Sequence, residues 1–180
     1  MRYGLALPSG IPGVFGMFHR EHGGRRQQNQ QRRGTVHGAA TAAAGFMRAL
    51  SIRSFDLVTK RHEAALLAVE PALSAVRCSL FRERGIGKHP TIVIGGFVPD
   101  ATEAVEFQRP ILRKYGSIYY LNFPKNGFST AILHAQINDI IAYLAQKRQR
   151  PTLLGISFGC GLVVDFLKQA NEVTHSRIKG

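Results

Sequence analysis

The sequence contains only two cysteines, Cys78 and Cys160, among 180 residues. Two cysteines cannot form the disulfide framework of small secreted domains, so nothing in the chain requires an oxidising compartment, and we expect a cytoplasmic location. These cysteines and the seven histidines also lack the spacing of metal ligands, such as H-x-x-x-H or C-x-x-C. We therefore expect no metal site.

Long apolar runs and acidic residues are scarce as well. No stretch approaches the roughly 20 apolar residues of a membrane-spanning helix, so we predict no membrane span. Only 11 acidic residues oppose 24 Lys and Arg, and the excess lies mainly in residues 1–88, with 14 basic and five acidic residues. The arginines come with no nucleic-acid-binding motif and no interleaved aromatic residues, so we expect no nucleic-acid partner. A nucleic-acid binder acting through its basic tail is the weaker alternative.

Residues 1–55 are predicted to be a basic N-terminal extension without a fold of its own. Residues 1–18 are broken by glycine and proline, and residues 19–38 are polar, with paired arginines and a glutamine-rich run. Such a segment buries too little apolar surface to offset the entropy cost of ordering it. A transit peptide or a twin-arginine export signal is an alternative, but serine is sparse and the segment is only weakly hydrophobic. We therefore place the folded domain at residues 56–180.

Within residues 56–180, predicted strands alternate with predicted helices. The expected elements are a short helix near 64–68, a weak strand over 76–81, a buried strand over 91–94, a helix from 109 to before 116, a strand over 117–121, an amphipathic helix from 132 to about 147, a strand over 152–156 and a helix from 162. This alternation is typical of an α/β fold with a mostly parallel sheet and helices on both faces.

The segment Gly155-Ile156-Ser157-Phe158-Gly159 carries the clearest chemistry and has the pattern G-x-S-x-G. A serine on a sharp strand-to-helix turn adopts a strained backbone, and side chains two residues before and after it would collide. The helix that follows directs free N–H groups and a partial positive charge at the place where an oxyanion would form. Glycine is abundant, so the pattern alone is weak, but a predicted strand precedes it and a predicted helix follows it. Ser157 is therefore the candidate nucleophile.

Over roughly residues 89–170, the chain resembles the α/β-hydrolase superfamily. Gly95-Gly96-Phe97 stands where many members have a His-Gly-x turn, so the resemblance implies that the N–H groups of Phe97 and Phe158 would bind an oxyanion. Residues 122–129 (N-F-P-K-N-G-F-S) are similar to the family's Asp-x-Pro-Gly-His-Gly-x-Ser loop, with Gly127 retained and the first, fourth and fifth positions changed. These two segments and the G-x-S-x-G turn follow one another in the family's order.

The family places an acidic residue and then a histidine after the serine. Only 23 residues follow Ser157, with Asp165 inside the predicted helix and His175 too close to come from a loop beyond a later strand. His134 is expected to be a partly exposed helix residue. We therefore expect that the triad acid and histidine are not in this chain and that the fold is incomplete at the C-terminus. The strand over 152–156 would then be an unpaired sheet edge, through which copies of the chain could self-associate.

The resemblance implies a serine hydrolase that attacks an ester, thioester or amide and forms an acyl-serine intermediate on a small-molecule substrate. No cofactor is expected, because Gly95-Gly96 lacks the G-x-G-x-x-G spacing of dinucleotide sites. Serine is a weak nucleophile without an adjacent imidazole, so we expect this chain by itself to be a largely inactive N-terminal portion of a hydrolase. Two alternatives stay open. One is an acyltransferase on the same fold, and the other is a non-catalytic scaffold without acid and histidine.

Overall fold

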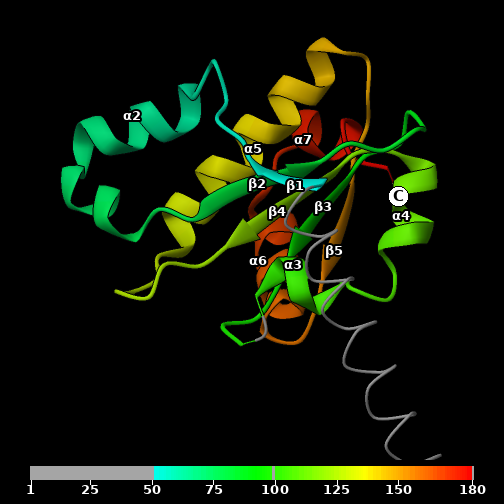
Figure 1. Ribbon diagram of the computed structural model, residues 1–180. Helices are drawn as coiled ribbons and strands as arrows, with labels where there is room; N and C mark the ends of the chain where they lie inside the picture. The colour runs from blue at the N-terminus through cyan, green and yellow to red at the C-terminus, as the bar shows by residue number, and fades with distance from the viewer. Residues whose placement is uncertain (1–50, 99, 180) are drawn as a thin grey trace, which may run out of the picture. The chain divides into compact units, whose positions relative to one another are not determined.

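Five strands form one sheet in the computed structural model, which describes residues 51–98 and 100–179 (Figure 1). The order across the sheet is β1-β2-β4-β3-β5. The strands are β1 (Ile52–Ser54), β2 (Ser79–Glu83), β3 (Thr91–Ile94), β4 (Ile118–Asn122) and β5 (Thr152–Gly155). Most of the predicted N-terminal extension lies outside the described residues. The last residues of this extension are described, and they include β1, which lies before the predicted boundary at residue 55. The folded domain therefore begins earlier than the sequence indicated.

The centre of the sheet is parallel, as predicted. β3 pairs in parallel with β4 and β5, so that Ile92 lies opposite both Tyr119 and Leu153. β2 pairs antiparallel with β4, and β1 pairs antiparallel with β2. β5 is a terminal strand of this sheet, which agrees with the expectation that residues 152–156 form an edge.

Helices cover both faces of the sheet (Figure 1). They are α2 (Arg61–Val69), α3 (Ala101–Ala104), α4 (Arg109–Tyr115), α5 (Thr130–Gln146), α6 (Phe158–Gln169) and α7 (Glu172–Ser176), with a 3₁₀ turn over Pro71–Val76. Ile92 and Ile94 of β3 pack with residues of α5 and α6 on one face. Val93 packs with Ala101 of α3 on the other. Successive side chains of a strand point to opposite faces, so the fully buried run of β3 serves two cores, as the sequence predicted.

The amphipathic stripe of α5 is confirmed. Its predicted apolar positions are all buried, namely Ile132, Leu133, Ile137, Ile140, Ile141 and Leu144. Of the described helices, none is long and apolar enough to cross a membrane.

The fold also contains an interhelical cap. Asp139 of α5 is only 2% exposed, and its carboxylate accepts hydrogen bonds from the backbone N–H groups of His62 and Glu63, each at 2.9 Å. The N-cap residue of α2, Lys60, makes no side-chain cap of its own. The first N–H groups of a helix have no partner within the helix, so Asp139 supplies acceptors that α2 lacks locally.

A buried ion pair lies on the opposite face. Arg109 of α4 donates two hydrogen bonds to the carboxylate of Glu83 in β2, at 2.9 and 3.0 Å, and Tyr120 donates a third at 2.8 Å. Burial by itself would raise the pKa of Glu83, but the hydrogen bonds from Arg109 and Tyr120 outweigh it and hold this pKa below its usual value. The carboxylate of Glu83 thus accepts three hydrogen bonds, two from Arg109 and one from Tyr120, and these offset the cost of burying its charge.

Candidate active site

Ser157 occupies the sharp turn between β5 and α6. It is the N-cap of α6, it is exposed, and its backbone angles are φ 55° and ψ −122°. Among the described non-glycine residues, only Ser157 and Arg148 have positive φ. Such a backbone conformation costs on the order of 1–3 kcal/mol and persists only where the surrounding structure enforces it. The turn thus has the strain that the G-x-S-x-G pattern predicted, while the role of Ser157 as a nucleophile stays a prediction.

The two glycines of the pattern are required by close backbone contacts. A Cβ atom on Gly155 would lie 2.6 Å from the carbonyl oxygen of Gly159 and 2.7 Å from the Cα of Cys160. A Cβ atom on Gly159 would lie 2.0 Å from the carbonyl oxygen of Ile94, at the end of β3. The start of α6 is therefore pressed against the end of β3, and any side chain would force the two segments apart.

The turn after β3 lies beside Ser157. A Cβ atom on Gly96 would be 3.9 Å from the Cβ and Oγ atoms of Ser157. The rings of Phe97 and Phe158 stack, with centroids 5.1 Å apart and an interplanar angle of 25°. Within residues 51–98 and 100–179, neither the Phe97 N–H nor the Phe158 N–H donates a hydrogen bond. The structure therefore brings together the serine and both residues whose N–H groups the resemblance assigns to an oxyanion hole.

Asn122, at the end of β4, anchors the loop that carries Phe97. Its Oδ1 accepts from the Ala101 N–H at 3.0 Å, and its Nδ2 donates to Asp100 Oδ2 at 3.0 Å. Asp100 also caps α3, since its Oδ1 accepts from the N–H groups of Thr102 and Glu103. Gly95 at the start of the loop has no room for a side chain, because a Cβ atom would lie 2.7 Å from the Ala101 nitrogen.

Gly127 is the supporting glycine that the resemblance placed in the loop after β4. Its φ is +145°, a backbone conformation that favours glycine, and a Cβ atom there would lie 2.9 Å from Val76 Cγ1. This loop is therefore held close to the end of the 3₁₀ turn.

Four phenylalanines form an aromatic cluster at the serine turn, a feature that the sequence analysis did not identify. Their ring centroids lie 5.1–6.3 Å apart in every pair, and the members are Phe97, Phe123, Phe128 and Phe158. Phe97 is 55% exposed and Phe158 is 45% exposed. A sequence signal does exist, because three of the four stand just after β3, β4 and β5, and parallel strands end at one edge of a sheet. The cluster offers an apolar surface beside the candidate nucleophile.

The histidines named in the sequence analysis lie elsewhere. His134 on α5 packs its ring against Phe166, and its Nε2 is 3.4 Å from Asp165 Oδ2. Asp165 is eight residues along α6 from Ser157, or about 12 Å at the helical rise of about 1.5 Å per residue. Burial lowers the pKa of His134, and the charge of Asp165 opposes this shift only in part. The exposed His175 lies on α7.

In the part of the chain that the structure describes, no histidine makes a hydrogen bond to Ser157. The same residues contain no group of three or more His, Cys, Asp or Glu side chains that could hold a metal ion.

No family model matches the chain, and no curated protein matches it either. Solved structures similar to parts of it include two crystal structures. One is the crystal structure of bromoperoxidase from Bacillus anthracis, at 21% identity and a TM-score of 0.39, covering 53% of this chain and 39% of that one. The other is the crystal structure of a membrane phospholipase A, described as a novel bacterial virulence factor, at 16% identity and a TM-score of 0.40, covering 83% and 49%. This chain spans less than half the length of either.

The described residues form a mixed α/β fold with a sheet that is parallel at its centre, helices on both faces and a strand-turn-helix junction at Ser157, which agrees with the predicted α/β-hydrolase type.

Proposed function

We propose that this chain carries the nucleophile and oxyanion-binding part of a serine hydrolase, with Ser157 attacking the carbonyl carbon of an ester, thioester or amide. The positive φ of Ser157 at the junction of β5 and α6 is the observation that supports this most directly. A strained serine on a strand-to-helix turn exposes its Oγ at the end of the sheet, where a substrate carbonyl can reach it. In the acyl-serine step, Oγ bonds to the carbonyl carbon, its proton goes to a base, and the alcohol, thiol or amine departs.

The Phe97 and Phe158 N–H groups are proposed to stabilise the oxyanion that forms when Ser157 attacks. Both groups are free of acceptors in the described part of the chain, and the Phe158 N–H stands at the positive end of α6. Two such donors held in place before the reaction can supply several kcal/mol of transition-state stabilisation, at about 2.7–4 kcal/mol for each donor.

The aromatic cluster supports an apolar acyl group as the part of the substrate next to the reacting carbonyl. Phe97 and Phe158 expose about half of their surface beside Ser157, and an aliphatic or aromatic acyl chain would remove that surface from water. Within residues 51–98 and 100–179, the cation–π contacts involve Phe55 and Tyr143 and none of these four rings. An acyl chain without charge is therefore the substrate class we propose.

The chain by itself is proposed to turn over slowly. Activation of a serine requires an adjacent base, and no described histidine contacts Ser157. The oxyanion donors alone can still give some catalysis over water.

Fluorophosphonate labelling followed by peptide mapping tests the proposal. We expect slow, stoichiometric modification of Ser157, no modification in Ser157→Ala, and unchanged labelling in Ser129→Ala, which alters another serine in the loop after β4. Labelling of a different residue, or none in a folded sample, would contradict the nucleophile assignment. Rapid turnover of p-nitrophenyl butyrate, lost in Ser157→Ala, would instead show that the chain contains its own base.

A further inference from the structure

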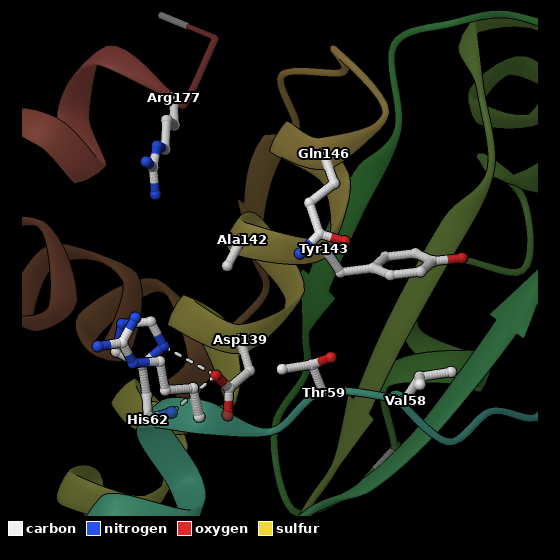
Figure 2. Close-up of a pocket in the computed structure, with 9 residues that line it drawn as sticks. Val58, Thr59, His62, Asp139, Ala142, Tyr143, Gln146 and Arg177 are labelled. Atoms are coloured by element: carbon white, nitrogen blue, oxygen red, sulfur yellow. Dashed lines mark hydrogen bonds and ion pairs between the residues drawn. The ribbon is translucent and has the colours of Figure 1, made fainter.

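A cavity of about 660 Å³ lies beside α5, where this helix meets α2 and the end of α7 (Figure 2). Its wall includes Arg61, His62, Asp139, Ala142 and Arg177. None of its lining residues belongs to the Ser157 turn, to the loop that carries Phe97 or to the aromatic cluster. Its size falls within the range of small-molecule sites, which is about 300–1,000 Å³. The cavity is therefore a binding site candidate separate from the proposed hydrolase chemistry.

Two arginines in the wall of this cavity, Arg61 and Arg177, carry positive charge and have no partner among the described residues. In the part of the chain that the structure describes, the side chains of Arg61 and Arg177 make no hydrogen bond or ion pair. Both residues are exposed to solvent. Figure 2 shows the Arg177 side chain extending into the space on the side where His62 lies. Arginine side chains commonly bind carboxylate or phosphate groups, because the planar guanidinium donates two parallel hydrogen bonds.

The one carboxylate in the wall does not neutralise these arginines. Asp139 is 2% exposed and accepts hydrogen bonds from the N–H groups of His62 and Glu63 and from His62 Nδ1 at 2.8 Å. Its negative charge is thus compensated by the N-terminus of α2 and the His62 ring. An incoming anion would meet two unpaired guanidinium groups and a histidine.

The remainder of the wall suits an organic body attached to the anion. Val58, Ala142 and Tyr143 contribute apolar atoms, and Thr59 and Gln146 add polar groups. The Tyr143 hydroxyl is already engaged, since it accepts a hydrogen bond from Lys147 Nζ. A free inorganic anion would leave most of a cavity of about 660 Å³ unfilled.

We propose that this cavity binds a small organic phosphate monoester, with the phosphate between Arg61 and Arg177 and the organic group against Ala142. A phosphate monoester carries about −1.5 to −2 charges and three acceptor oxygens at neutral pH, enough to engage both forks at once.

Titration of the full 180-residue chain with phenyl phosphate, followed by calorimetry and by amide NMR shifts, tests this assignment. We expect saturable binding, with shifts concentrated at residues 58–62, 139–146 and 177. The double variant Arg61→Gln/Arg177→Gln should bind roughly a hundredfold more weakly, because it removes at least two charge-assisted hydrogen bonds and each weakens binding by about tenfold. Circular dichroism and a thermal melt of the variant verify that it is folded.

The matched control is Arg84→Gln/Lys88→Gln, which removes the same two charges from exposed residues before β3 that do not line this cavity. It should bind phenyl phosphate as the unaltered chain does. Equal weakening in the control would show general attraction to a basic protein and would overturn the proposal. So would unchanged binding in Arg61→Gln/Arg177→Gln, or inorganic phosphate binding as tightly as phenyl phosphate, since the organic body would then contribute nothing.

Discussion

Asn122 at the end of β4 and Asp100 at the start of α3 are joined by a hydrogen bond of 3.0 Å from Nδ2 to Oδ2. The Oδ1 atom of the same amide accepts a hydrogen bond from the Ala101 N–H, so the Asn122 side chain binds both residues at the start of α3. This loop begins at Gly95 and carries Phe97, one of the two proposed oxyanion donors. The position of a backbone N–H next to Ser157 therefore depends on a pair of side chains outside the serine turn.

Replacement of Asn122 by Asp should loosen this loop. The variant keeps an acceptor for the Ala101 N–H, but it loses the donor to Asp100 and places a second carboxylate against the first. We expect a loss of about 1–3 kcal/mol of unfolding free energy at neutral pH, and faster amide hydrogen exchange at residues 101–103. Asn126→Asp, the same change at an exposed position of the loop after β4, is the control. If both variants melt alike, the bond between Asn122 and Asp100 does not hold the loop.

Ser157→Gly should stabilise the protein. Glycine adopts positive φ without the steric cost that a serine pays at φ 55°, so relief of strain should raise the unfolding free energy by about 1 kcal/mol, offset in part by the greater entropy of the unfolded chain. Ser157→Ala keeps the Cβ atom and should leave stability nearly unchanged. Chemical denaturation of the three proteins measures the difference. Equal stability of the glycine and alanine variants would mean that the turn is not strained.

A pair of Gly→Ala variants in the first turns of α6 should have opposite effects. At Gly159 the added methyl group would lie 2.0 Å from the Ile94 carbonyl oxygen, whereas at Gly161 it meets nothing within 4 Å. We expect Gly159→Ala to lose about 3 kcal/mol or more through overpacking, and Gly161→Ala to gain up to about 1 kcal/mol from helix propensity. Thermal melts of both variants provide the measurement. A tolerated Gly159→Ala would show that α6 does not press on the end of β3.

Because of the ion pair between Glu83 and Arg109, the free energy of unfolding should decrease as the pH falls into the acid range. The pKa of Glu83 is lowered in the folded state, so its contribution is complete above the ordinary value of 4.5 and is lost as the pH falls through the lower folded value. Glu83→Gln removes the buried carboxylate that accepts two hydrogen bonds from Arg109 and leaves Arg109 with its longer contact to Glu106 at 3.3 Å, so it should cost about 3 kcal/mol at pH 7.

The cost of Glu83→Gln should shrink steadily below pH 4.5, because the unaltered chain then loses the same charge. Urea titrations from pH 3 to pH 7 measure it. Glu70→Gln, at an exposed position, should show neither the cost nor the pH dependence. A cost for Glu83→Gln that does not change with pH would mean that the carboxylate charge is not what stabilises this site.

The sequence was sufficient where one segment carries its own pattern. The β-branched run of β3, the three- and four-residue spacing in α5 and the glycines around Ser157 are local signals, and the structure agrees with each. α6 begins at Phe158 and not at Leu162 as predicted. Gly159, Cys160 and Gly161 are weak helix formers, so the sequence did not indicate a helix there. Their place in α6 depends on the close contact of Gly159 with the end of β3.

The sequence was insufficient where a distant group decides the local structure. The strand predicted over 76–81 begins at Ser79, because the N–H and C=O of Cys78 bond to the side-chain amide of Gln136 and so have no place in the ladder. β1 has only three residues and no alternating pattern, and it forms because β2 offers an edge to pair with. The aromatic cluster and the Asn122 amide bond depend on which strands become neighbours, and strand order cannot be read from a single segment.

The cap that Asp139 gives to α2 implies an order of folding. The two ends of this interaction are 76 and 77 residues apart in the chain, so closing it requires β2, β3 and β4 to be in place or nearly so. α2 has nine residues and no cap of its own, and isolated helices of that length barely form in water. A peptide covering residues 58–72 should therefore be largely unstructured. In the whole chain, α2 should gain its amide protection among the last elements and lose it among the first.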